Sequence, residues 1–485
     1  MTLLLSLAGC CLLFAPDAPD VPPVDEDTHA PVDTGEPPDT DPLLFDPWVT
    51  HSLADAEVRL TGAGSGDRLG YAVSAGDIDG DGAIDLVVGA PGHDALEVSA
   101  AGAAYVAWGP VLGGARTVTD GAVAVLGAEV ESRLGYAVAG GGDADGDGRD
   151  DLLLGLPGLD GRAGAVALVA GATLGASDLG VGGATALWRA GAADTYAGGE
   201  VAWVGDVDGD GLADALVGGW GAAEDAGSAW LVLGAGLVGE GSLADADVAW
   251  VGEAPGDHLG SALAGLGDLD GDGLDEVVVG APDAMAAAGR VYVLGGGAAT
   301  VGDAWATLTG LAPGDWAGDA VAAAGDVDGD GLPDLLVGAT GEDGGGVDAG
   351  AARLVTGAAL AGGGDVSLAD AGVVAVGATG EDYAGFALGA GGDPDDDGTP
   401  DLLVGAPNFD PLGSEDRGRM AVVAVDRVRG DPIDTPSGFE GDEDRSYAGW
   451  RVLGPGDLDG EPGDDVVVSA PWASASGAVY VVSGR

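Results

Sequence analysis

Seven short segments of this chain are rich in aspartate and share one nine-residue pattern. Each reads Asp-x-Asp-Gly-Asp-Gly-x-x-Asp or a close variant, and the seven loops begin at Asp77, Asp143, Asp206, Asp268, Asp326, Asp393 and Asp457. Four carboxylates so close together concentrate negative charge that a hard divalent cation can neutralise. Calcium accepts about six to eight oxygen ligands from carboxylates, backbone carbonyls and water. The pattern therefore predicts calcium sites.

Comparison among the seven loops assigns the ligands. Acidic side chains stand at positions one, three, five and nine, whereas position seven holds Ala, Arg, Leu, Leu, Leu, Thr and Gly in turn. A position that is fixed in spacing but indifferent to side chain suits a backbone carbonyl ligand. The candidate metal ligands are Asp77, Asp79, Asp81, Ala83, Asp85; Asp143, Asp145, Asp147, Arg149, Asp151; Asp206, Asp208, Asp210, Leu212, Asp214; Asp268, Asp270, Asp272, Leu274, Glu276; Asp326, Asp328, Asp330, Leu332, Asp334; Asp393, Asp395, Asp397, Thr399, Asp401; Asp457, Asp459, Glu461, Gly463, Asp465.

Two loops depart from the pattern. The sixth has Asp396 where glycine is usual, and aspartate tolerates a left-handed backbone better than most residues. The seventh contains Glu461 and Pro462, and proline cannot adopt a positive φ. We therefore expect six or seven Ca²⁺ ions, with the seventh loop as the uncertain site.

An EF-hand loop is the rival metal-binding interpretation, because it also begins with acids at positions one, three and five. It requires an acidic ligand at position twelve and flanking helices. Position twelve holds Val or Leu in all seven loops. These residues belong to apolar runs typical of strands, so the EF-hand interpretation is rejected.

The loops recur 58 to 67 residues apart, and a fixed period of this size indicates a repeat architecture. One unit can be followed through apolar runs at 69–73, 86–88, 104–108 and 122–126, separated by glycine-rich turns. Four short strands per unit are typical of one propeller blade. The predicted fold class is all-β, a seven-bladed β-propeller.

The two ends of the chain predict how the ring closes. The last unit stops after the run 478–482 and has no fourth strand. A spare strand, 57–62, precedes the first unit and resembles the fourth strand at 249–252. We expect this N-terminal strand to complete the last blade and remove an exposed sheet edge.

Leu69-Gly70-Tyr71-Ala72, the loop at Asp77 and Gly89-Ala90-Pro91 together resemble the FG-GAP repeat. Gly-Ala-Pro recurs at Gly280 and Gly405, and the likeness covers residues 51–485. The resemblance implies the seven-bladed propeller found in integrin α chains and many bacterial surface proteins. It also implies that the metal loops lie on the face opposite the ligand, so that the calcium is structural.

Composition excludes several functions. The net charge of −66 disfavours binding to nucleic acid, which relies on basic contacts to phosphate. It also disfavours adsorption to anionic membranes. All sixteen basic residues are Arg, which excludes mechanisms that need a lysine. The four histidines show no metal-ligand spacing, and no Gly-x-Ser-x-Gly elbow occurs.

The N-terminus differs from the rest of the chain. Residues 1–14 contain Leu7-Ala8-Gly9-Cys10, which resembles the lipobox of bacterial lipoproteins, although no basic residue precedes the apolar run. The resemblance implies lipidation of Cys10 and an outer-membrane location in a Gram-negative bacterium. Residues 15–50 are rich in Pro, Asp and Thr, a composition that cannot bury enough apolar surface to fold. We expect them to form a tether that displays the propeller, residues 51–485, at the cell surface.

Two functions remain open from the sequence. The first is a monomeric, calcium-stabilised binding or adhesion module whose ligand is a protein or a polysaccharide. The alternative is a propeller-type enzyme, or the accessory domain of one, that acts on cell-surface polysaccharide or lipid. No catalytic residue stands out, so we expect a binding protein rather than an enzyme.

Overall fold

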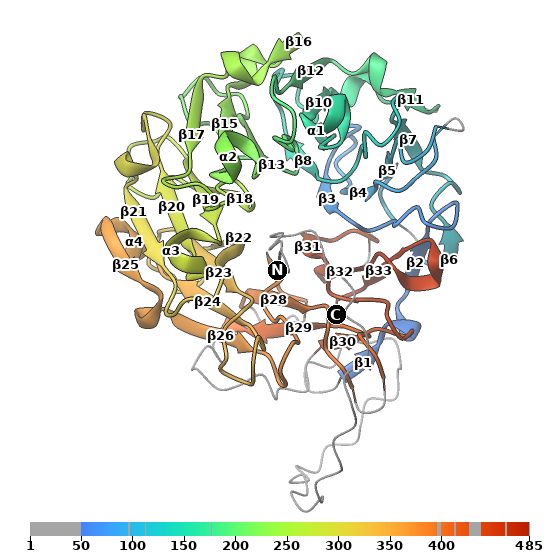
Figure 1. Cartoon of the computed structure of the whole chain (residues 1–485). Helices are drawn as coiled ribbons and strands as arrows, with labels where there is room; N and C mark the ends of the chain where they lie inside the picture. Colours follow the sequence, from blue (N-terminus) through green and yellow to red (C-terminus); the bar gives the residue numbers. More distant parts are fainter. Residues whose placement is uncertain are drawn as a thin grey trace, which may run out of the picture.

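The computed structural model describes residues 50–95, 98–111, 113–175, 177–394, 399–411, 414–425, 438–460 and 463–484. Seven sheets are arranged around a central axis, as Figure 1 shows in a view along that axis. The first strands of the sheets lie nearest the axis and the later strands lie outside them. The predicted seven-bladed β-propeller is confirmed.

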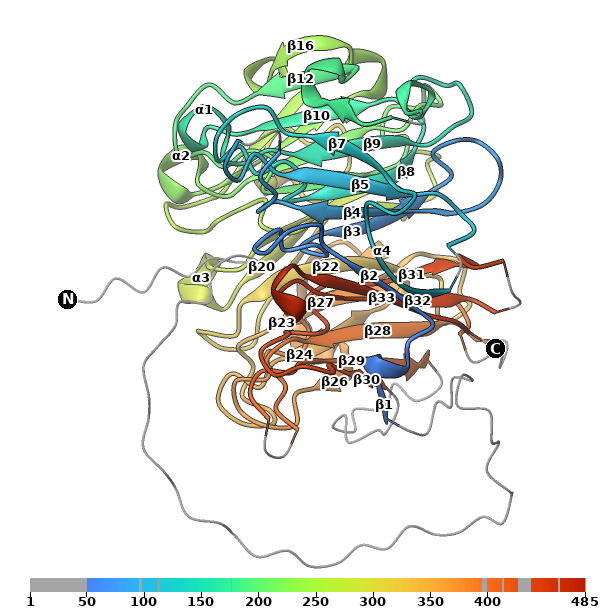
Figure 2. The same cartoon turned by 90° about the vertical axis from the view of Figure 1, so that its right-hand side faces the viewer.

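The first blade shows how the sequence builds each sheet. It contains β3 (Val73–Gly76), β4 (Asp85–Ala90), β5 (Ala103–Ala107) and β7 (Val123–Leu126), each antiparallel to its neighbour. Figure 2 shows these four strands side by side, at right angles to the view of Figure 1. Every residue of β4 and β5 is buried, because other blades cover both faces of the sheet. This explains their nearly continuous apolar sequences.

The other six blades repeat this order of four antiparallel strands. Their bounds are β8 (Val138–Gly142), β9 (Asp151–Gly155), β10 (Ala165–Val169), β12 (Ala186–Arg189); β13 (Glu200–Trp203), β14 (Ala215–Gly219), β15 (Ser228–Val232), β17 (Val248–Val251); β18 (Leu263–Gly267), β19 (Glu276–Ala281), β20 (Arg290–Leu294), β21 (Ala306–Thr309); β22 (Ala317–Gly325), β23 (Asp334–Ala339), β24 (Ala351–Val355), β26 (Gly372–Val376); β27 (Ala387–Ala390), β28 (Asp401–Ala406), β29 (Arg419–Ala424), β30 (Gly438–Glu440); β31 (Val452–Gly456), β32 (Asp465–Ala470), β33 (Ala478–Val482), β2 (Val58–Thr61).

In the described ranges, helices are short and confined to connections. The α-helices are α1 (Leu159–Arg162), α2 (Ala222–Asp225), α3 (Ala284–Ala287) and α4 (Gly357–Ala361). The first three follow the second strand of their blades, and each contains three residues with positive φ, so they are tight turns.

Among the described residues, five blades carry a fifth strand that the sequence did not predict. These strands are β1 (Thr50–Ser52), β6 (Gly114–Thr117), β11 (Leu179–Gly180), β16 (Gly239–Ser242) and β25 (Gly364–Ser367). In the chain, each of these strands comes just before the fourth strand of one blade. In space, it pairs in parallel with the fourth strand of the blade before that one. The added strand covers the outer edge of that sheet, where unpaired backbone groups would otherwise remain.

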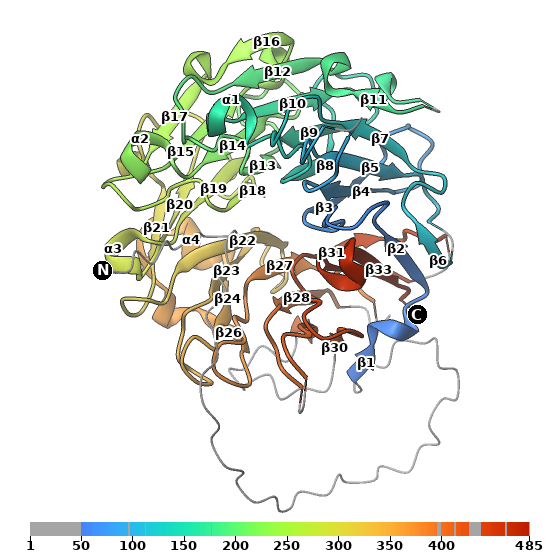
Figure 3. The ribbon, with the colours of Figure 1, turned by 45° about the vertical axis from the view of Figure 1, so that its right-hand side comes forward.

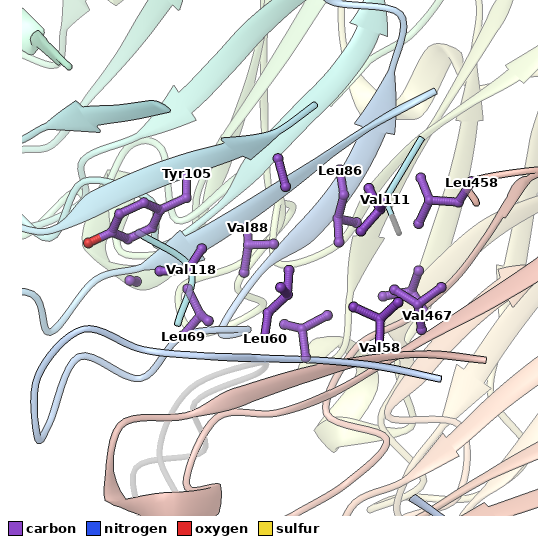
Figure 4. Packing of buried hydrophobic residues seen from close by; sticks show 14 of the residues in the cluster. Val58, Leu60, Leu69, Leu86, Val88, Tyr105, Val111, Val118, Leu458 and Val467 are labelled. Carbon is purple, nitrogen blue, oxygen red and sulfur yellow. The ribbon is translucent and has the colours of Figure 1, made fainter. Parts of the chain in front are cut away.

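The ring closes through the N-terminal strand, as expected. β2 pairs with β33 of the last blade, with Val58 opposite Val481, and β6 covers its other edge. β1, just before β2, pairs with β30 of the sixth blade. Figure 3 shows both contacts, so the start of the described chain joins the last two blades. Figure 4 shows Val58 and Leu60 of β2 packed among apolar side chains of the first and last blades.

Glycine pairs set the spacing between blades. In six blades the Gly of the Gly-Ala-Pro-like segment faces the Gly of the Leu-Gly-like segment in the next blade, whereas the seventh blade has Ser469 at this place, facing Gly70. A Cβ added at Gly89 would lie 2.0 Å from the carbonyl oxygen of Gly135, and one at Gly280 would lie 2.2 Å from that of Gly318. Gly135 and Gly318 also have φ values of 81° and 87°. At these two contacts the backbones therefore approach too closely for any side chain, which explains why glycine recurs at both places.

Candidate metal loops and the axial cavity

The nine-residue loops all connect the first strand of a blade to its second strand. Because successive strands are antiparallel, these connections emerge on one face of the ring, which we call the loop face. The turns between second and third strands lie on the opposite face. The topology therefore gathers acidic loops from all seven blades on the loop face.

The carboxylates within a loop are held by its own backbone. In the first loop, Asp77 Oδ2 accepts a hydrogen bond from Gly82 N (3.0 Å), and Asp79 Oδ1 accepts one from Asp81 N (3.0 Å). Asp81 Oδ1 accepts one from Ala83 N at 2.8 Å. Loops two to five repeat these contacts. These turns bring acidic side chains together before any ligand binds.

Carboxylate oxygens converge in the first five loops. One oxygen from each of three acids lies within 4.8 Å of the others in each cluster. The clusters are Asp77, Asp79, Asp85; Asp143, Asp145, Asp151; Asp206, Asp208, Asp210; Asp268, Asp270, Glu276; and Asp326, Asp328, Asp334. Such spacing allows a single cation to contact all three oxygens, and all-oxygen ligands suit Ca²⁺. The residues present therefore fit the expected metal, which would neutralise their charge and fix the turns.

Position nine holds the loop against its own blade. Asp85, 1% exposed, accepts hydrogen bonds from Ile78 N (2.9 Å) and from Gly109 N (2.7 Å), which follows the third strand. Asp151, Asp214 and Asp334 make the equivalent pair of contacts. Each carboxylate oxygen has two lone pairs, so these bonds leave room for a metal ion.

Burial raises the pKa of these position-nine acids. The pKa rises to about 6 for Asp85, Asp151, Asp214 and Asp465, and to about 7 for Glu276. Desolvation is the main cause, and the other carboxylates of the same loop add repulsion. A bound divalent cation would oppose both effects by favouring the ionised form.

The sixth and seventh loops are described only in part. Asp393, Thr399 and Asp401 lie in the described part of the sixth loop, whereas 395–398 lie outside it. In the seventh loop, Asp465 accepts hydrogen bonds from Leu458 N (2.8 Å) and from Gly484 N (3.2 Å), which follows the third strand, as position nine does elsewhere. Glu461 and Pro462 lie outside the described residues, as do Cys10 and residues 15–49 of the predicted tether, 15–50.

Acids at position eight form contacts that the sequence analysis missed. Asp150 Oδ2 accepts a hydrogen bond from Asp77 N (2.7 Å), although the two residues belong to neighbouring blades. Asp275 contacts Asp206 N, and Asp464 contacts Asp393 N, each at 2.9 Å. The backbone N–H of Asp150 also donates to Asp77 O at 3.0 Å. Position eight therefore joins one loop to the first ligand residue of the loop before it.

A second polar site lies on the ring axis, away from the loops. A cavity of about 230 Å³ is lined by residues from the start of the first strand of every blade. Its charged side chains are Glu200, Asp319 and Arg451. Arg451 Nη2 of the seventh blade lies 3.8 Å from Glu200 Oε2 of the third blade, so the pair spans the axis. The sequence analysis missed this site, because Glu200, Asp319 and Arg451 belong to three different blades and come together only when the ring closes.

Comparison with known families supports this architecture. The FG-GAP repeat model matches residues 69–107, 259–294 and 317–355, which lie in the first, fourth and fifth blades. Fold and repeats together define a seven-bladed β-propeller with FG-GAP repeats. No curated protein sequence matches the chain. Among the described residues, no helix has the length and apolar character needed to cross a membrane.

Proposed function

We propose that this protein is a calcium-stabilised β-propeller that acts as a binding or adhesion module outside the cell. The observation that carries the proposal is the repeated convergence of acidic oxygens in equivalent loops on one face of the ring. The loops connect strands within rigid blades, so an ion in each would stabilise the scaffold. The opposite face and the axial cavity would then be free for a ligand.

The calcium concentration outside cells supports the proposed extracellular location. Extracellular calcium modules bind at about 10⁻⁴–10⁻³ M, a concentration range found outside cells. FG-GAP repeats are consistent with a surface domain. Lipidation of Cys10 would anchor the chain to the outer membrane through the tether, with the monomeric propeller displayed beyond it.

The anchor is tested by Cys10→Ala. Membrane fractionation should move the variant from the membrane to the soluble fraction, whereas Cys11→Ala should remain with the membrane. Unchanged membrane association of Cys10→Ala would refute the lipoprotein proposal.

The binding function is tested with the calcium-loaded protein immobilised on beads. Cell-envelope polysaccharides and solubilised envelope proteins are applied separately, beside a screen for glycoside and ester hydrolysis. Saturable capture that calcium removal abolishes supports a binding module. Turnover of a substrate without saturable capture would favour the alternative, an enzyme acting on cell-surface polysaccharide or lipid.

A further inference from the structure

The mouth of the axial cavity is divided into two chemically different halves. One residue follows the Leu-Gly-like segment in each blade, and these seven residues surround the axis. In blades six, seven, one and two they are Phe386, Trp450, Tyr71 and Tyr136, whereas in blades three, four and five they are Gly199, Ser261 and Asp319. At this position of the repeat, aromatic rings therefore stand on one side of the axis, and small or acidic residues stand on the other.

The aromatic side is a continuous arc. The ring centroids of Tyr136 and Tyr71 lie 4.8 Å apart, those of Tyr71 and Trp450 lie 5.5 Å apart, and those of Trp450 and Phe386 lie 4.6 Å apart. Tyr136 and Phe386, at the two ends of the arc, line the cavity. Trp220 from the third blade lines it as well. Aromatic walls attract cations as well as apolar groups.

On the acidic side, the carboxylate of Asp319 has an oxygen that can accept a hydrogen bond from a ligand. Asp319 Oδ2 accepts a hydrogen bond from the Thr340 hydroxyl at 2.7 Å. Within the described part of the chain, no protein donor reaches its Oδ1. Burial raises the pKa of Asp319 to about 6, and the charge of Asp283 adds to the effect. Its side chain is therefore mostly ionised at neutral pH.

The charges of the cavity favour one class of ligand. The formal charges of the lining side chains Glu200, Asp319 and Arg451 sum to −1. Burial raises the pKa of Glu200, and the nearby positive charge of Arg451 opposes this rise. Arg451 is already beside Glu200, so the unbalanced charge belongs to Asp319. The chain as a whole carries −66, which draws cations toward it and repels anions. A metal ion is disfavoured, because Asp319 and Glu200 offer far fewer than the roughly six oxygens that calcium needs.

We propose that the axial cavity binds a monovalent organic cation, an ammonium or guanidinium group, with the charge at Asp319 and the carbon skeleton against Tyr136 and Phe386, the two members of the aromatic arc that line the cavity. The group can belong to a free small molecule or to a Lys or Arg side chain of a polypeptide. This proposal rests on the binding function above but not on calcium, the anchor or adhesion. The cavity volume suits a single headgroup or side chain.

The test titrates the calcium-loaded, full-length protein with benzylammonium by calorimetry or ligand-observed NMR. Benzyl alcohol, similar in size but uncharged, is the matched probe. Binding of benzylammonium at least about tenfold tighter than benzyl alcohol supports the proposal. Equal binding, or no binding of benzylammonium at millimolar concentration, would overturn it.

Two variants locate the site and shift affinity in opposite directions. Asp319→Asn should weaken benzylammonium binding about tenfold, whereas Asp120→Asn, the same change at an exposed position, should leave it unchanged. Arg451→Gln removes the resident cation and should tighten binding several-fold. Loss of folding cannot produce this gain, and melting curves in calcium verify that each variant is folded. Equal effects of Asp319→Asn and Asp120→Asn would contradict the assignment.

The source of the cation is tested with a blocked lysine, N-acetyl-lysine-N-methylamide, against its norleucine analogue. Selective binding of the lysine compound indicates that a polypeptide side chain is accepted, whereas binding of benzylammonium alone indicates a small-molecule site. Envelope capture and benzylammonium binding are measured separately, so failure of one proposal is distinguishable from failure of the other.

Discussion

The side chain of Asp150 bonds the backbone N–H of Asp77 at 2.7 Å, across the boundary between the first two blades. Asp77 is the first candidate ligand of its loop, so an ion there would be held in place partly by the neighbouring blade. The charges of Asp77 and Asp143 raise the pKa of Asp150 beyond the effect of its burial. Without a cation, this contact therefore brings repulsion together with a hydrogen bond.

We expect Asp150→Ala to destabilise the calcium-loaded protein by about 1–2 kcal/mol, because it removes a hydrogen bond to a charged group. In metal-free protein the loss should be smaller, because the substitution also relieves repulsion from Asp77 and Asp143. Chemical denaturation with and without calcium measures both values. Asp120→Ala is the control for loss of an exposed charge, and an equal cost of Asp150→Ala in the two conditions would contradict the coupling.

The pH dependence of stability should change sign with calcium. Five position-nine acids have pKa values of about 6 or 7 when folded, above the usual value of about 4: Asp85, Asp151, Asp214, Glu276 and Asp465. Between pH 4 and 6 the folded metal-free chain holds more protons than the unfolded chain, so its stability falls as pH rises. Calcium requires ionised ligands, so its stabilising increment should grow with pH.

Melting curves of protein freed of metal on a chelating resin, at pH 5 and 7.5 with and without calcium, test this sign change. We expect the metal-free protein to melt higher at pH 5 and the calcium increment to be larger at pH 7.5. A calcium increment that is the same at both pH values would rule out the buried acids as ligands.

The N-terminal strands should act as a two-part closure. Removing residues 1–56 deletes β1 but keeps β2, whereas removing residues 1–64 deletes both and leaves β33 at an open edge. We expect melting temperature to fall and aggregation to rise in that order, relative to a chain starting at Asp46. Scanning calorimetry and light scattering measure these effects, and equal stability of the three chains would mean that the ring closes in another way.

Close approach of blades should make the interface glycines irreplaceable. Gly280→Ala places a methyl group 2.2 Å from the Gly318 carbonyl oxygen, whereas Gly191 has no neighbour within 4 Å of an added Cβ. Overpacking costs about 1–3 kcal/mol, so Gly280→Ala should lower the free energy of unfolding by at least that amount. Gly191→Ala should be nearly neutral. Denaturant titration compares the two, and similar results would contradict the packing argument.

The sequence predicts those features of the fold that depend on a local pattern of residues and recur in every repeat. Blade strands such as 86–88 are apolar runs between turns, and the closing strand at 57–62 resembles other fourth strands. The sequence did not predict the fifth strands, because they lie at the solvent-exposed edges of the sheets. Gly239–Ser242, for example, has no apolar alternation and is mostly exposed or half-buried.

Contacts across blades were also beyond sequence reasoning. Asp150 and Asp77 are 73 residues apart, and acids at position eight occur in only some loops. The cavity residues Glu200, Asp319 and Arg451 come from three separate blades. Only the closure of the ring places them around one axis, so no local pattern could reveal them.

Counting the bound calcium ions, together with measuring the melting temperature before and after chelation, tests the central proposal most directly. Native mass spectrometry of the calcium-loaded protein should show six or seven ions, and chelation should remove them and lower the melting temperature strongly. Magnesium should restore little stability, because it demands a tighter octahedral shell. Asp79→Ala should remove one ion and cost more stability than Asp459→Ala, whose loop contains Pro462. Two or fewer ions, or a melting temperature indifferent to chelation, would contradict a calcium-stabilised propeller.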